Sequence, residues 1–109
     1  MHAKVDAFSV PQCRVFCIRL WMELTIAVRS IWSDERVDQQ TQLAAMKWLN
    51  EIQHRVHGAY VRNNTEALRW LLERIASHCN ECPAITGHVR TALERAFAAA
   101  ALAEDDTIG

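Results

Sequence analysis

Apolar residues recur along the segment 10–32 with the spacing of an α-helix, and they form two lines rather than one. At 100° per residue, a broad stripe faces one direction; it consists of Val10, Cys13, Cys17, Leu20, Trp21, Leu24, Val28 and Ile31. A thinner line lies roughly opposite and consists of Val15, Ile18, Met22 and Ile26. Because a helix that is apolar on two sides is buried twice, this pattern predicts a helix that contacts its own domain and a second surface.

Three later segments carry one apolar stripe each. Their inward positions are Ala45, Met46, Leu49, Ile52, Val56, Ala59 and Tyr60 in the first, Leu68, Leu71, Leu72, Ile75 and Cys79 in the second, and Val89, Ala92, Leu93, Ala96, Phe97 and Ala100 in the third. Short polar segments that contain capping residues or proline separate the helices. We therefore expect an all-α fold, an antiparallel four-helix bundle with helices at about 10–32, 38–61, 65–79 and 84–103.

The composition fits a single helical domain over residues 1–109. Half of the residues are hydrophobic, and only three glycines and two prolines are present. A chain of 109 residues can bury one core without metal or disulfide support. We expect residues 1–9 to form a flexible arm that is ordered only if Phe8 finds a pocket, and residues 104–109 to form a frayed tail.

The charge of the chain argues against some classes of binding partner. A formal net charge of −1 predicts no general attraction to nucleic acid or to an anionic membrane. Arg19 and Glu23 interrupt the apolar run of the first helix, which argues against a membrane span and against a secretory signal. We expect the protein in the cytoplasm, where its four cysteines stay reduced.

The cysteines form two close pairs, which raises the question of a structural zinc site. In an up-down-up-down bundle, Cys13 and Cys17 lie at one pole, whereas Cys79 and Cys82 lie at the other. At about 1.5 Å per residue, the segment 65–79 alone separates the poles by roughly 20 Å. One metal ion therefore does not reach both pairs, and no metal is expected. A weaker candidate is a zinc site at one pole, formed by His78, Cys79, Cys82 and His88.

No catalytic motif is present in the sequence. It contains no HExxH segment, no phosphate-binding loop and no dinucleotide fingerprint, and its serines lack the strand–turn–helix context of a nucleophile elbow. We therefore expect a protein that is not an enzyme and that uses no cofactor.

The apolar residues that lie outside the predicted core favour an interface with another chain. A monomeric bundle does not need to bury all of its apolar residues. Those in excess are the second line of the first helix, Val15, Ile18, Met22 and Ile26, and Trp70 on a charged helix face. We predict a two-fold homodimer formed through these residues. The corresponding function is that of a small non-catalytic protein that acts through self-association and protein–protein interaction.

An alternative function is the binding of an apolar small ligand. Trp21, Met22, Met46 and Trp48 are residue types that line such pockets. They would form a pocket between helices or at the dimer interface, although aromatic and methionine side chains at helical spacing also form ordinary core.

Overall fold

The computed structural model describes residues 7–108, and it describes side chains for residues 7–103. Within this range it contains the helices α2 (Val10–Ser33), α3 (Gln39–Arg62), α4 (Thr65–Glu81) and α5 (Pro83–Ile108). The all-α prediction is confirmed, and the boundaries agree within a few residues except that α5 continues past residue 103. No glycine or proline lies between Ala103 and Gly109 to end that helix earlier.

Local side-chain chemistry explains where the helices begin. The backbone N–H of Gln12 donates to Oγ of Ser9 at 3.2 Å, and the backbone N–H of Ser9 donates to Oε1 of Gln12 at 2.8 Å. This reciprocal capping box fixes the start of α2. Asp38 caps α3 and Asn64 caps α4, as the sequence allowed. Asn63 closes α3 in the left-handed conformation at φ 51°, which asparagine adopts more readily than most residues.

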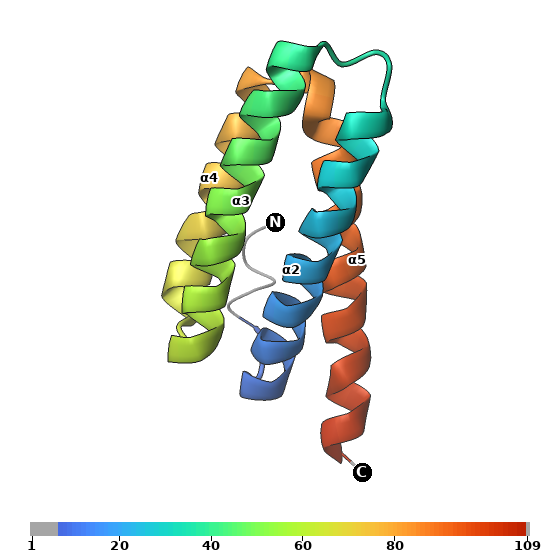
Figure 1. The fold of residues 1–109 in the computed structure, drawn as a ribbon. Coiled ribbons are helices and arrows are strands. Elements are labelled where there is room, and N and C mark those ends of the chain that lie inside the picture. Colours follow the sequence, from blue (N-terminus) through green and yellow to red (C-terminus); the bar gives the residue numbers. More distant parts are fainter. Residues whose placement is uncertain (1–6, 109) are drawn as a thin grey trace.

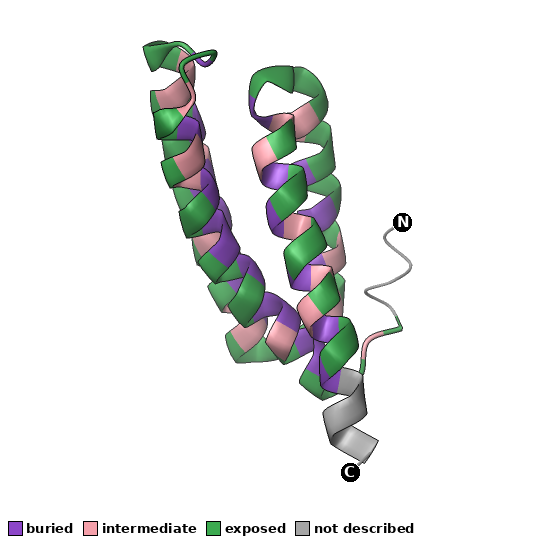
Figure 2. Ribbon diagram, turned by 90° about the vertical axis from the view of Figure 1, so that its right-hand side faces the viewer, coloured by how far each residue is buried: buried purple, intermediate pink, exposed green. Residues whose placement is uncertain are grey.

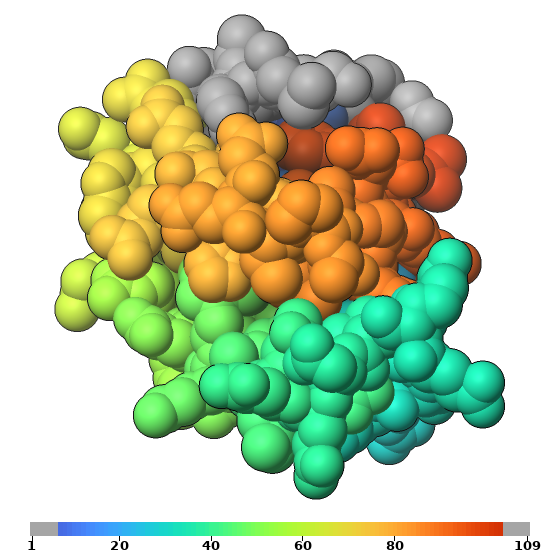
Figure 3. Space-filling model, turned by 90° about the horizontal axis from the view of Figure 1, so that it is seen from above, coloured from blue at the N-terminus to red at the C-terminus, as the bar shows by residue number. Residues whose placement is uncertain are grey.

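The four helices run alternately up and down, so that each is antiparallel to the next (Figure 1). Contacts join α2 with α3, α3 with α4, α4 with α5, and α5 with α2, and the contact of α2 with α5 is the most extensive. The described helices thus form an elongated bundle, with principal extents of 47 × 23 × 22 Å. Viewed from above, the α2–α3 connection lies beside the turn between α4 and α5 (Figure 3).

The core runs along the inner side of all four helices (Figure 2). Its largest fully buried side chains are Phe16, Leu20, Leu24, Ile31, Leu49, Val56, Leu68, Leu71, Ile75, Ile85 and Val89. Within the described part of the chain, no helix combines the length and the apolar character that a membrane crossing requires.

Phe8 closes one end of this core. Its ring centroid lies 5.5 Å from that of Phe16 and 6.0 Å from that of Phe97. The pocket that the sequence required for an ordered Phe8 therefore exists. The rest of the predicted arm, residues 1–6, lies outside the described residues.

The buried sector of α2 differs from the predicted stripe. Val10 and Trp21 were placed in the core and are exposed, whereas Phe16 and Ala27 are buried. On the helical wheel, this difference is a rotation of the buried sector towards the side that α5 covers. Met46 of α3, also expected in the core, is partly exposed. The predictions for these three positions were wrong because apolar spacing does not show which neighbouring helix packs more closely.

Candidate functional site

Three apolar side chains form a line on the outer surface of α2, which we call the α2 ridge: Ile18, Met22 and Ile26. They are 48%, 50% and 46% exposed. Because they are spaced four residues apart, they stack along one side of the helix. The structure therefore places these predicted interface residues outside the core. The fourth residue of the predicted line, Val15, is half-buried.

Trp70 belongs to a different surface. It lies on α4, which is diagonally across the bundle from α2 (Figure 1). The guanidinium carbons of Arg55 and Arg74 lie 5.7 Å and 5.0 Å from the centroid of its exposed ring, within the range of a cation–π contact. Trp70 therefore does not extend the α2 ridge, although the sequence had grouped it with that surface.

A groove lies beside the ridge, between α2 and α3, and we call it the α2/α3 groove. Its volume is about 340 Å³, and it is lined by Cys17, Ile18, Trp21, Met22, Val56, His57 and Tyr60. Two of the residues predicted to line a ligand pocket, Trp21 and Met22, are thus together. Met46 and Trp48 are not among the lining residues, and the ring of Trp48 instead stacks on His78 with centroids 3.9 Å apart.

The structure keeps the two cysteine pairs at opposite poles of the bundle. Cys13 and Cys17 lie near the start of α2, and Cys79 and Cys82 lie at the end of α4 (Figure 1). His78 is engaged with Trp48, and Nε2 of His88 lies 2.9 Å from Oδ2 of Asp34. Among the described residues, no group of three or more histidine, cysteine, aspartate or glutamate side chains is arranged to hold a metal ion. The weaker zinc candidate therefore has no assembled ligand set in this structure.

Burial raises the pKa of one thiol in each cysteine pair. It raises the pKa of Cys17 to about 12, with a further contribution from neighbouring Cys13. Burial also raises the pKa of Cys79, which is only half-buried. Because the thiolate is the reactive form, we expect Cys17 to react slowly in the folded protein.

We predict that a thiol-specific reagent such as Ellman's reagent modifies only Cys79 and Cys82 in the native protein. Cys13 and Cys17, which are 2% and 1% exposed, should react only after denaturant is added. In the double variant Cys79→Ser/Cys82→Ser, the native reaction should nearly disappear while the denatured protein still yields two thiols. Rapid native modification in that variant would contradict the burial of the α2 pair.

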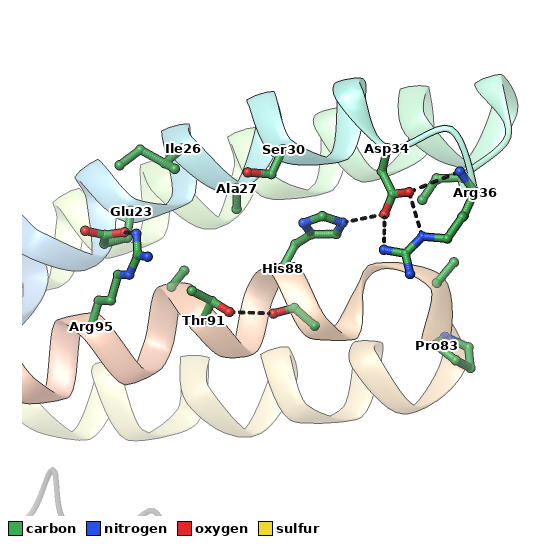
Figure 4. A pocket seen from close by; sticks show the side chains of 14 residues that line it. Glu23, Ile26, Ala27, Ser30, Asp34, Arg36, Pro83, His88, Thr91 and Arg95 are labelled. Carbon is green, nitrogen blue, oxygen red and sulfur yellow. Dashed lines mark hydrogen bonds and ion pairs between the residues drawn. The ribbon is translucent and has the colours of Figure 1, made fainter.

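A second, polar groove lies between α2 and α5, and we call it the α2/α5 groove (Figure 4). Its volume is about 600 Å³. It is lined by Glu23, Ile26, Ala27, Ser30, Asp34, Arg36, Val37, Pro83, Ala84, Gly87, His88, Thr91, Ala92 and Arg95. This groove gathers carboxylate, imidazole, guanidinium and hydroxyl groups, and the sequence did not predict it.

Among these groups, the Asp34 carboxylate accepts the most hydrogen bonds. Nε and a terminal nitrogen of Arg36 donate to its two oxygens at 2.9 and 3.0 Å, and the backbone N–H of Arg36 donates at 3.0 Å. These bonds, together with the contact to His88, hold the pKa of Asp34 well below its usual range. Asp34 is therefore an ionised carboxylate at neutral pH.

Glu23 is a buried carboxylate at the other end of the groove. It is 4% exposed, and Nε of Arg19 donates to its Oε2 at 2.9 Å, while a terminal nitrogen of Arg95 lies 3.5 Å from Oε1. In the sequence, Glu23 reads as a polar residue between two apolar lines. Only the packing of α5 against α2 buries Glu23, so no sequence signal indicated that its carboxylate is buried.

Comparison with known protein families, with curated proteins and with solved structures finds no match for this chain.

Proposed function

We propose that this chain is a small non-catalytic protein that acts through self-association, with the α2 ridge as the contact. The observation that supports the proposal is the exposure of Ile18, Met22 and Ile26 in one line on a well-anchored helix. Burying apolar surface of this kind is worth about 25 cal/mol per Å². A second copy offers the same surface, and most soluble oligomers are two-fold dimers.

The spacing of the ridge suits a two-fold axis. An axis that passes beside Met22 and pairs two antiparallel copies of α2 sets Ile18 of one copy against Ile26 of the other, because both lie four residues from Met22. The same register sets Arg19 opposite Thr25 rather than opposite another arginine. The contact is thus self-complementary, as a two-fold interface requires.

Two of the charged neighbours of the ridge, Arg14 and Arg19, have partners within their own chain. Arg19 bonds Glu23 at 2.9 Å, and Arg14 donates to the hydroxyl of Tyr60 at 3.4 Å. Side chains restrained in this way surround the apolar centre as a polar rim, the usual composition of a protein interface.

Multi-angle light scattering tests this proposal. The wild-type protein should have the mass of a dimer at micromolar concentration, and Met22→Lys should have the mass of a monomer, because an interfacial ammonium loses its hydration without gaining a partner. Leu43→Lys is the matched control, since Leu43 on α3 is similarly exposed at 47% and should leave the dimer intact. A monomeric wild type, or equal loss of mass in both variants, would refute the role of the ridge.

Binding of an apolar ligand is the second candidate function, and the exposed Trp21 in the α2/α3 groove favours it. This function needs the groove to remain open in solution. A wild-type protein that is monomeric at all concentrations would favour ligand binding over self-association. For either function we place the protein in the cytoplasm, because its four cysteines are free thiols.

A further inference from the structure

A small pocket lies between α3 and α4, and we call it the α3/α4 pocket. The two helices lie side by side and are joined by a short turn (Figure 1). The pocket has a volume of about 190 Å³ and shares no lining residue with either groove described above. It is lined by Arg55, Gly58, Ala59 and Arg62 of α3 and by Ala67, Trp70 and Leu71 of α4. Because these positions are three or four residues apart on each helix, each set shares one helix face.

A missing side chain keeps this pocket open. Gly58 lies in the interior of α3, where glycine destabilises a helix relative to alanine. A Cβ atom at position 58 would meet no other atom within 4 Å, so close helix packing does not explain the glycine. The buried Ala59 and Leu71 supply an apolar floor. A larger side chain at position 58 would occupy the space above that floor.

Trp70 forms an aromatic wall of the pocket. Its side chain is 48% exposed, and contacts with the guanidinium groups of Arg55 and Arg74 restrain the ring. Aromatic rings stack favourably on such a surface. A protein cavity of about 150 Å³ holds one benzene molecule, so a pocket of about 190 Å³ has the size for one six-membered ring and a small substituent.

The charge of the pocket favours an anion. Its lining contains two arginines and no acidic residue. A terminal nitrogen of Arg55 donates to Oε1 of Glu51 at 3.2 Å. Arg62 is exposed, and within the described part of the chain it pairs with no carboxylate. The guanidinium of Arg62 therefore keeps its donors for a carboxylate, whose planar shape it matches.

We propose that the α3/α4 pocket binds a small monocarboxylate that carries one aromatic ring. The ring stacks on Trp70 in the space that Gly58 leaves, and the carboxylate bonds the guanidinium of Arg62. Arg62 is one helical turn from Gly58, so the two contacts lie within reach of one small molecule. The α2 ridge lies diagonally across the bundle from α4. The pocket is therefore accessible in a monomer and equally in a dimer formed through that ridge.

NMR titration of the ¹⁵N-labelled protein with benzoate tests this site. Saturable shifts are expected at the indole N–H of Trp70, identified by its loss in Trp70→Phe, and at the Nε–H of Arg62. Cyclohexanecarboxylate has the same charge but no aromatic ring, and it should bind about threefold more weakly. Benzamide has the shape of benzoate without its charge, and it should bind about tenfold more weakly.

Two matched pairs of variants separate the pocket from general effects. Gly58→Leu fills the pocket and should abolish saturable binding of benzoate. Gly87→Leu is its control, because Gly87 is a helical glycine of α5 with the same open space around a Cβ atom, and it should bind benzoate as the wild type does. Both variants should keep their helices, since leucine favours a helix more than glycine does.

The second pair tests the charge. Arg62→Gln should weaken binding of benzoate at least fivefold, because it removes the charged donor of the carboxylate. Arg90→Gln, which removes an exposed arginine of α5, should leave the affinity unchanged. Shifts that do not saturate, equal affinity for benzoate and either comparison compound, or equal losses within either pair of variants would overturn the proposal.

Discussion

Phe16→Ala should destabilise the protein by about 3–5 kcal/mol, the usual cost of removing a buried phenylalanine. Phe16 is 0% exposed, and its ring centroid lies 4.6 Å from that of Phe97 and 5.5 Å from that of Phe8. Truncation therefore leaves a cavity between α2 and α5 and also removes the aromatic contacts that hold Phe8. For a domain of ordinary stability, about 5–15 kcal/mol, this is a large fraction of the total.

Urea denaturation followed by circular dichroism measures this effect. The control is Leu43→Ala, which removes a large side chain that is 47% exposed on α3, away from the ridge, and should change the free energy of unfolding by about 0.5 kcal/mol or less. All variants are compared at one protein concentration, since self-association would add a concentration-dependent contribution. Equal destabilisation by both substitutions would show that the aromatic cluster does not support the bundle.

Ala96→Leu should destabilise the protein by about 1–3 kcal/mol for the opposite reason, because it inserts volume into a filled interface. Ala96 is 0% exposed and lies one turn from the buried Ala92 and Ala100. These methyl groups belong to the helix that makes the most extensive contact with α2. A leucine at this position has to push the two helices apart or adopt a strained rotamer.

The same denaturation experiment tests this prediction, with Ala98→Leu as the control. Ala98 is an exposed residue of α5, and leucine has nearly the helix propensity of alanine, so the control should stay close to the wild type. If Ala96→Leu proved neutral or stabilising, α5 would not pack against α2 through its alanines.

The α2/α5 groove could not be predicted from the sequence, although the sequence contains every residue that lines it. Glu23 and Asp34 are on or next to α2, and His88 and Arg95 are on α5, so their encounter depends on which helices pair and in which register. His88 points away from the apolar stripe of α5, which by itself indicates a solvated side chain. Its contact with Asp34 exists because the α2–α3 connection and the start of α5 lie at the same pole (Figure 3).

Local sequence determined the four helices, because apolar periodicity, capping residues and proline act within a few residues of the chain. It also determined that Ile18, Met22 and Ile26 lie outside the core, since they are opposite the dominant stripe of α2. Only the tertiary structure decided the side of α2 that α5 covers, and that choice buried Phe16 and Glu23, exposed Trp21 and separated Trp70 from the ridge. Helix pairing depends on the fit of whole surfaces, which the spacing of residues along one helix does not encode.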